Sequence, residues 1–336
     1  MSTGAFEFGR GAGNARLTAV APMRQTLAWE RVEMTVSCRD TDWIPKVRGA
    51  GGVVAGPDGS LCQIMHNGLR VAAGAYHGEW MSEIIRRLRG HHEPQEEVLF
   101  NAVLPLIESA DAVPVMLELG SFWAYYSLWF RPFYGRGRSI LVEPDPGNLG
   151  VGETNFKLNG FCGESLLAAV GAHNGSAEFS CESDGAVRSL KTVSVDGLVR
   201  DLSIERIHLL HADIQAAELA MLEGAAETIK RGKLDWLFLS THHYSISGDP
   251  LTHQDCLRWL QAHGAYIVEE HSVAESFSGD GLIVAAFGRE PRISYPPISR
   301  NVPSRALFRE TEYDLAEAWE EIRRLRRELR DLSGKC

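Results

Sequence analysis

The sequence has few cysteines and no pairing pattern among them. Its six cysteines, in 336 residues, form no C-x-x-C pair, which argues against a disulfide framework and against a zinc ribbon. Basic residues are not in excess either, because 34 Lys and Arg stand against 44 Asp and Glu and give a net charge of -10. Such a chain offers no overall positive field to a phosphate backbone, so we expect no nucleic acid partner.

Long apolar runs are also missing. No run approaches the roughly 18 residues that a membrane-spanning helix needs. Residues 1–17 lack the basic and then apolar order of a signal peptide. We therefore expect no membrane span and a cytoplasmic location, where the cysteines would stay reduced.

The composition is that of a globular protein, with 44% hydrophobic and 23% charged residues. Changes of pattern along the chain divide it into four segments. They are a flexible arm at 1–25, a β/α segment at 26–109, a main α/β domain at 110–292, and a linker with an amphipathic helix at 293–336. In the β/α segment, Pro-Asp-Gly and Asn-Gly separate short apolar stretches, which is typical of hairpins.

Apolar runs of strand length alternate with helical stretches after residue 111. Five of these runs lie at residues 113–119, 139–144, 165–172, 206–214 and 234–240. Nearly continuous apolar strands separated by helices indicate a parallel sheet with both faces covered. Two more runs, 266–272 and 281–288, are too close for a helical crossover and predict an antiparallel pair at the sheet edge. The predicted fold class is α/β, doubly wound, with a mostly parallel seven-stranded sheet.

The ends of the first two strands carry the residues most informative about a ligand, because such sheets bind ligands at the carboxyl ends of their strands. The first strand ends in Glu118, Leu119, Gly120 and Ser121, and the glycine would admit a ligand close to the backbone. The second ends with Glu143 and Pro144, where an acid typically accepts hydrogen bonds from ribose hydroxyls. The full glycine fingerprint for a dinucleotide is missing. A nucleoside without a diphosphate is therefore expected.

An ordered series of motifs resembles the FkbM-type S-adenosylmethionine-dependent methyltransferases. The family pattern D-x-G-A-x-x-G-x-x-S/T is similar to residues 118–127, and E-P-x-P to residues 143–146. An L-N pair follows at 158–159 and a V-x-V-D segment at 193–196. The box K-x-D-x-E/Q-G-A-E-x-x-x-L-x-G-A is similar to residues 211–225. The series is specific where no single motif would be.

The resemblance implies a Rossmann-like class I methyltransferase fold that binds S-adenosylmethionine. Glu118, Gly120 and Ser121 would surround the methionine end of the cofactor, and Glu143 would hold the ribose hydroxyls. The cofactor-binding set implied in this way is completed by Pro144, Ala172 and Asp213. This chain departs from the family pattern at five positions: Glu118 replaces an aspartate, Ser121 an alanine, Ala124 and Ala216 replace glycines, and His211 replaces a lysine.

Candidate catalytic groups lie at the ends of the fourth and fifth strands. Asp213 ends the fourth strand, and His242 and His243 follow the fifth. In one mechanism, His242 or His243 is the general base and Asp213 orients it or the acceptor. In the other, Asp213 and His242 ligate a divalent cation such as Mg²⁺, which acidifies the acceptor hydroxyl. We favour the mechanism without a metal.

A second polar cluster, Gly90–Glu97 (GHHEPQEE), precedes the first strand of the sheet. In chains that look like this family such a segment can cap the cofactor pocket, and a solvated turn is the alternative. The cluster lacks the H-x-x-x-H spacing of a helical zinc site, so we do not expect zinc there.

The resemblance favours an O-methyltransferase that acts on a hydroxyl of a sugar, glycan or secondary metabolite, with residues 26–109 supplying the acceptor pocket. The alternatives are an inactive methyltransferase-like binding module and a nicotinamide-dependent oxidoreductase. The terminal helix either packs on its own domain or forms a homodimer. Its apolar stripe consists of Leu315, Trp319, Ile322, Leu325, Leu329 and Leu332.

Overall fold

The computed structural model describes residues 28–56, 59–107 and 113–308, and residues 315, 319–320, 322–327 and 329–330 of the terminal helix. The expected arm at 1–25 and Leu332 lie outside the described residues. No helix in this part of the chain has both the length and the apolar content to cross a bilayer.

The apolar runs form the centre of a seven-stranded sheet. Its order is β12-β13-β11-β10-β4-β5-β6. The central strands are β4 (Val115–Leu119), β5 (Arg138–Glu143), β10 (Ile207–Ala212) and β11 (Leu234–Thr241), which run parallel and are buried at nearly every residue. The predicted fold class is confirmed.

The two sheet edges follow from the rest of the pattern. β13 (Gly281–Ala286) runs antiparallel to both β11 and β12 (Tyr266–His271), which confirms the predicted antiparallel pair. β6 (Glu164–Leu167) forms the other edge, beside β5. The chain proceeds outward from β4 to β6 and then returns to β10 beside β4. This reversal opens a crevice at the carboxyl ends of β4 and β10, where doubly wound sheets bind ligands.

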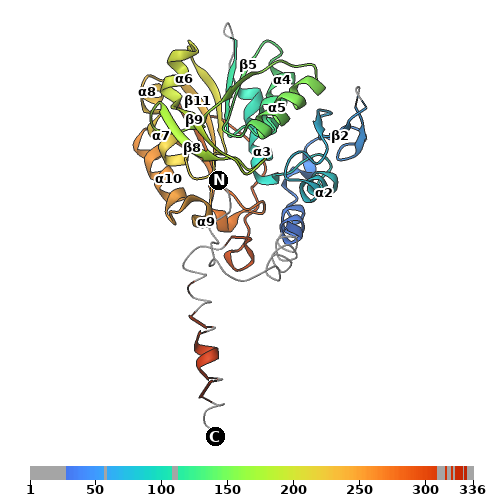
Figure 1. Cartoon of the computed structure of the whole chain (residues 1–336), viewed down its shortest axis with the longest axis vertical. Coiled ribbons are helices and arrows are strands. Elements are labelled where there is room, and N and C mark those ends of the chain that lie inside the picture. The colour runs from blue at the N-terminus through green and yellow to red at the C-terminus, as the bar shows by residue number, and fades with distance from the viewer. Residues whose placement is uncertain are drawn as a thin grey trace.

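Alternate residues of the central strands enter two separate hydrophobic cores. Met116 of β4 packs with α4 (Tyr125–Phe133) and α5 (Pro146–Leu158), whereas Leu117 packs on the opposite face. The helices of that opposite face are α6 (Val195–Asp201), α7 (Glu218–Glu223), α8 (Ala226–Lys230) and α10 (Thr252–Ala262). Figure 1 shows these two groups of helices on the two sides of the sheet. Both faces are therefore covered, as the continuous apolar strands require.

The N-terminal segment packs onto the α4 side of the sheet. After a helix at 28–37 come η1 (Asp40–Trp43), β1 (Val53–Ala55), β2 (Leu61–Ile64), β3 (Arg70–Ala72), α2 (Glu79–Arg87), α3 (Pro94–Val103) and η2 (Leu104–Leu106). Val71, Ile84 and Phe100 of this segment join the same core as Trp129 of α4. The segment is therefore held against the sheet by a shared core, and its loops reach the carboxyl ends of the strands.

Of the two small three-stranded sheets beside the main sheet, the one that follows β6 in the chain was not predicted from the sequence. The run at 165–172 does not form one strand, because β6 ends at Leu167 and β7 (Ala169–Val170) joins a separate sheet. The other members are β8 (Gly175–Ser180) and β9 (Val187–Val193), which form a hairpin. β8 is mostly exposed and polar, so it carries no apolar pattern by which to recognise it.

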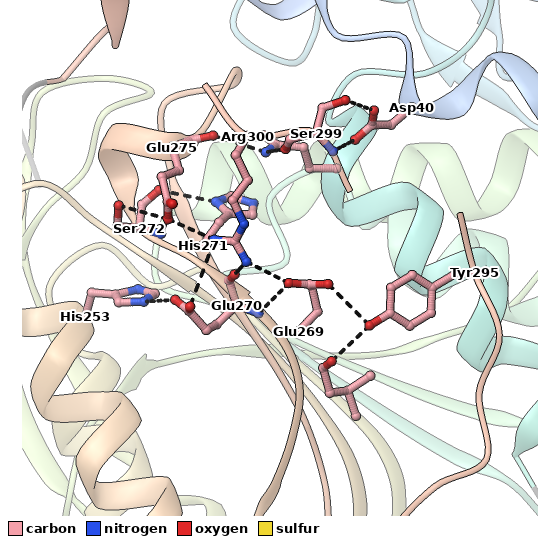
Figure 2. A network of polar contacts seen from close by, with 12 residues as sticks. Asp40, His253, Glu269, Glu270, His271, Ser272, Glu275, Tyr295, Ser299 and Arg300 are labelled. Carbon is pink, nitrogen blue, oxygen red and sulfur yellow. Dashed lines mark hydrogen bonds and ion pairs between the residues drawn. The ribbon is translucent and has the colours of Figure 1, made fainter. Parts of the chain in front are cut away.

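The chain after β13 forms a strap, residues 290–302, without helix or strand. Figure 2 shows how it is held: Arg300 donates to Glu269 at 2.8 Å and to Glu275 at 2.9 Å. The Tyr295 hydroxyl donates at 2.9 Å to the carbonyl of Val268, a residue of the outer strand β12. Two short helices flank this network, η3 (Val273–Glu275) and η4 (Pro303–Arg305). The strap therefore covers the exposed edge of the sheet.

The described residues of the terminal helix leave their apolar side chains exposed. Trp319 is 48% exposed and Leu329 is 65% exposed. In Figure 1 this part of the chain extends away from the sheet. Packing on its own domain is therefore not seen for these residues, and the homodimer stays a prediction.

Candidate functional site

A cavity of about 240 Å³ opens at the carboxyl ends of β4, β5 and β10. Six of the predicted site residues line it, namely Glu118, Gly120, Ser121, Glu143, Pro144 and Asp213. The predicted residues Ala172, His242 and His243 are not among the lining residues. The ends of β4 and β5, at which the ligand site was predicted, therefore line one cavity.

Gly120 allows the end of the neighbouring strand, and not only a ligand, to approach the backbone. Its φ is +71°, and a Cβ built on it would lie 1.8 Å from the backbone oxygen of Asp213. The Asp213 N–H donates to the Leu119 carbonyl at 3.0 Å, which fixes this close approach. The glycine therefore admits the neighbouring strand end, rather than only a ligand, and it sets the position of Asp213.

Glu143 is buried and oriented by the backbone around it. Its two oxygens accept hydrogen bonds from the N–H groups of Phe122 at 3.0 Å and Asp145 at 2.9 Å. Burial raises its pKa to about 7, against the lowering effect of those two hydrogen bonds. Each oxygen of an ionised carboxylate has a second lone pair, so Glu143 can still accept from two ribose hydroxyls.

Glu118 and Ser121 have different relations to the cavity. Burial raises the pKa of Glu118, whose Oε2 accepts the Ser127 N–H at 3.0 Å in the first turn of α4. Glu118 therefore caps this helix as well as lining the cavity. The Ser121 hydroxyl is buried without a hydrogen-bond partner. An orphaned buried hydroxyl at the wall of a cavity fits a polar group of a bound ligand.

The loops beside the cavity contain non-glycine residues in left-handed conformations. Ala124 has φ +59° and Ala216 has φ +86°. These are two of the positions at which the family pattern has glycine, so the structure explains that preference. An alanine in this region costs roughly 1–2 kcal/mol. Such strain is typical of functional loops.

Asp213 belongs to a cluster of charges with His242 and Glu218, which are both buried. His242 Nε2 lies 3.1 Å from Asp213 Oδ1, and its Nδ1 lies 2.6 Å from Glu218 Oε1. Burial alone would lower the pKa of His242, but the two carboxylates outweigh it and raise the pKa well above the usual value. His242 also offsets the burial of Asp213, whose pKa is lowered. In this arrangement His242 joins two carboxylates and orients Asp213, the one that lines the cavity.

The other predicted catalytic histidine lies to one side. His243 Nδ1 lies 3.0 Å from Ser245 Oγ, and the ring stacks near Phe308. It caps the short helix α9 (Tyr244–Ser247). Its part in catalysis stays a prediction.

The arrangement gives no support for a divalent cation at Asp213 and His242. Both ring nitrogens of His242 already lie against carboxylate oxygens, Nε2 at 3.1 Å from Asp213 and Nδ1 at 2.6 Å from Glu218. Among the described residues, the group with metal-ligand spacing is His66, His91 and Glu97. These residues already have partners: His66 Nδ1 lies 3.0 Å from the Tyr125 hydroxyl, and Glu97 accepts the His92 N–H at 2.7 Å.

The N-terminal segment supplies one wall of the cavity, from Tyr76, His77, His92 and Glu93. The solvated turn considered for residues 90–97 is wrong, because His92 and Glu97 are buried. Burial lowers the pKa of His92, but Glu93 and Glu97 outweigh it and raise the pKa to about 10. Glu93 accepts the Tyr126 hydroxyl at 3.0 Å. These residues reach the site through tertiary contacts, which the local sequence pattern does not indicate.

The β8–β9 hairpin supplies the opposite wall. Ala177, Glu178 and Phe179 line the cavity. Asp145 fixes the tip of the hairpin, because its carboxylate accepts the Ser183 N–H at 2.8 Å and the Ser183 hydroxyl at 2.5 Å. The same carboxylate caps α5 through Gly147 N–H at 2.8 Å. Asp145 therefore joins the second strand end to the hairpin.

The sheet order, with an antiparallel β13 between β11 and β12, and the crevice at the acidic second strand end are those of a Rossmann-like class I methyltransferase domain. The family model described as the methyltransferase FkbM domain matches residues 73–267. This is more than half of the chain, which therefore belongs to the FkbM methyltransferase family. A search of curated proteins found no match.

Several solved structures are similar to part of the chain. Precorrin-6y C5,15-methyltransferase from Geobacter metallireducens GS-15 is 14% identical, covers 59% of this chain and 89% of its own, and has a TM-score of 0.37. M. capricolum TrmK, in complex with S-adenosyl-homocysteine, is 14% identical over 69% of this chain and 86% of its own, with a TM-score of 0.36. The fibrillarin pre-rRNA processing protein of Methanococcus jannaschii is 13% identical over 53% and 67%, with a TM-score of 0.36.

Proposed function

We propose that the protein is an O-methyltransferase that transfers the methyl group of S-adenosylmethionine to a hydroxyl of a sugar, glycan or related secondary metabolite. One observation carries the proposal. A single cavity is lined by Gly120 and Glu143 at the strand ends, by His77 and Glu93 of the N-terminal segment, and by Asp213.

The donor side of the cavity is suited to a nucleoside. Glu143 would accept hydrogen bonds from the two ribose hydroxyls, and the unpartnered Ser121 hydroxyl would meet a polar group of the methionine end. The hairpin residue Phe179 closes this side. S-adenosylmethionine supplies a methyl group on a sulfonium, which reacts by in-line displacement.

The acceptor side must hold a hydroxyl in line with that methyl group. Asp213 would accept the hydrogen bond of the acceptor hydroxyl, and His242, whose Nε2 lies 3.1 Å from Asp213 Oδ1, would fix its orientation. As the new oxygen–carbon bond forms, the sulfur–carbon bond breaks, its electron pair goes to sulfur, and the hydroxyl proton passes to the carboxylate. Positioning of this kind can contribute about 7–11 kcal/mol to lowering the barrier. His242 or His243 as the base is the competing assignment.

Methyl transfer is tested by incubating the full chain and S-adenosylmethionine with candidate hydroxyl compounds and following the gain of one methylene by mass spectrometry. We expect Asp213→Asn to lower turnover by about 10²-fold or more with little change in cofactor affinity. The control is Asp235→Asn, because Asp235 lies at the start of β11, the end of the strand away from the cavity, and this variant should leave turnover and cofactor affinity unchanged. Turnover unchanged in Asp213→Asn would contradict the assignment. Loss of turnover in His243→Ala alone would identify His243 as the base.

The cofactor is tested separately by calorimetry. We expect S-adenosylhomocysteine to bind and NAD not to bind. Binding of NAD alone would indicate the oxidoreductase, whereas binding of S-adenosylhomocysteine without turnover of any hydroxyl acceptor would indicate a binding module. The described cysteines are all free, which supports the proposed cytoplasmic location.

A further inference from the structure

The acceptor side of the cavity is acidic, as the donor side is. Its walls carry the carboxylates of Glu93 and Asp213. Among the described residues that line the cavity, none is Lys or Arg. A substrate that enters here therefore meets negative charge without a lysine or arginine to neutralise its own anionic groups.

The cations near these carboxylates are already shared among several acids. The His242 ring contacts Asp213 at 3.1 Å, Glu218 at 2.6 Å and Asp280 at 3.7 Å. Arg31, on the helix at 28–37, pairs with Asp280 at 3.1 Å. One histidine and one arginine thus serve three carboxylates, which leaves a negative excess beside Asp213.

The same holds on the N-terminal wall. His92 Nε2 lies 3.3 Å from Glu93, and its Nδ1 lies 2.7 Å from Glu97. The His92 ring is almost fully buried between these acids. It is therefore engaged with protein carboxylates and is poorly placed to bind an anionic group of a substrate as well.

Aromatic rings stand next to these carboxylates. Tyr76 is stacked on Trp123 with 4.3 Å between ring centroids, and His77 meets Phe122 edge-on at 5.3 Å. All four line the cavity. Aromatic faces beside carboxylates provide apolar contact for the CH groups of a sugar ring and attract a cation through the ring quadrupole.

We infer that the acceptor is a sugar-like ring that bears a protonated amine beside its hydroxyls, and that acceptors carrying a carboxylate or phosphate are rejected. This inference rests on the proposed function and names the class of substrate. The methyl donor brings a net charge of one, whereas two carboxylates face this side of the cavity. The second carboxylate, Glu93, is the expected partner of the amine.

The test uses the full chain saturated with S-adenosylhomocysteine and three matched probes, the methyl glycosides of glucosamine, glucose and glucuronic acid. Their binding is measured by saturation-transfer NMR at neutral pH. We expect the glucosaminide to bind about tenfold or more tightly than the glucoside, less so at high salt, and the glucuronide to show no binding.

Variants locate the preference. Glu93→Gln keeps an acceptor for the Tyr126 hydroxyl and should reduce the preference for the amine to less than about threefold. Asp213→Asn is the second variant should Glu93→Gln fail to fold, as judged by its S-adenosylhomocysteine affinity. Glu290→Gln, an exposed change near the opposite end of the sheet, should leave the preference intact.

Three results would overturn the inference. They are equal binding of the glucuronide and the glucosaminide, no binding of any probe to a chain that binds S-adenosylhomocysteine, and an unchanged preference in the folded variants. Failure of S-adenosylhomocysteine itself to bind would overturn the proposed function, and this inference with it.

Discussion

Replacing Gly120 with alanine tests two reasons for a glycine at this position, its left-handed backbone conformation and the lack of space for a Cβ. The left-handed φ of +71° alone would cost roughly 1–2 kcal/mol with alanine. The added Cβ would also lie 1.8 Å from the Asp213 backbone oxygen, and backbone cannot rotate away as a side chain can. Forcing such an overlap typically costs about 1–3 kcal/mol more. We therefore expect Gly120→Ala to lower the free energy of unfolding by about 2–5 kcal/mol.

Gly232 provides a matched control for this experiment. Its φ is +63°, and a Cβ built on it meets nothing within 4 Å. Gly232→Ala should show only the conformational cost, about 1–2 kcal/mol, and the loss of unfolded-state entropy is the same in both variants. Urea denaturation measures both, and calorimetry should show weaker S-adenosylhomocysteine binding in Gly120→Ala alone. Equal destabilisation of the two variants would refute the steric argument.

Three further predictions concern the donor side and the strap. The folded pKa of Glu143, about 7, lies above its unfolded value, so the native state binds a proton that the unfolded state releases. The free energy of unfolding should therefore fall as pH rises from about 5 to 8. Glu143→Gln should remove about 3 kcal/mol of this pH dependence in urea titrations, and a pH dependence unchanged in the variant would contradict the assigned pKa. S-adenosylhomocysteine affinity should show the opposite trend and rise with pH in the wild type, because only the carboxylate accepts from both ribose hydroxyls. Asp145→Ala removes the α5 cap and the Ser183 contacts, so it should lower the free energy of unfolding by about 2 kcal/mol and weaken cofactor binding. The control Asp184→Ala breaks an exposed ion pair and should lower the free energy of unfolding by less than about 1 kcal/mol. Similar decreases in the two variants would show that the hairpin is not held by Asp145. Arg300→Ala removes partly exposed ion pairs with Glu269 and Glu275, so we expect the free energy of unfolding to fall by about 1 kcal/mol and proteolysis within residues 290–302 to become faster. Unchanged cleavage would show that other contacts hold the strap.

The parallel sheet was predictable because its strands are buried on both faces. Residues 113–119 and 234–240 read as continuous apolar runs, and β4 and β11 are buried at nearly every position. Once the strands were recognised, their ends identified Gly120, Glu143 and Asp213, all of which line one cavity. Local sequence sufficed here because a doubly wound sheet places its ligand at strand ends whatever the ligand is.

The other walls of the site were not predictable from local pattern. The β8–β9 hairpin is exposed and polar, so it lacks the apolar alternation of a half-buried strand. His92 and Glu93 reach the cavity through tertiary contacts, such as the hydrogen bond from Tyr126 to Glu93 across 33 residues. The charge of His242 likewise depends on Glu218, which lies 24 residues away in the sequence. Protonation states of this kind follow from the folded neighbours of a group and not from its own sequence position.

The most direct test of the central claim is calorimetric titration of the full chain with S-adenosylhomocysteine, comparing the wild type with Glu143→Ala. The account predicts one molecule bound per chain in the wild type and binding weakened by about 10²-fold in the variant, because a buried charged acceptor of two hydroxyls is lost. Equal affinity of the two proteins, or no binding to the wild type, would contradict it.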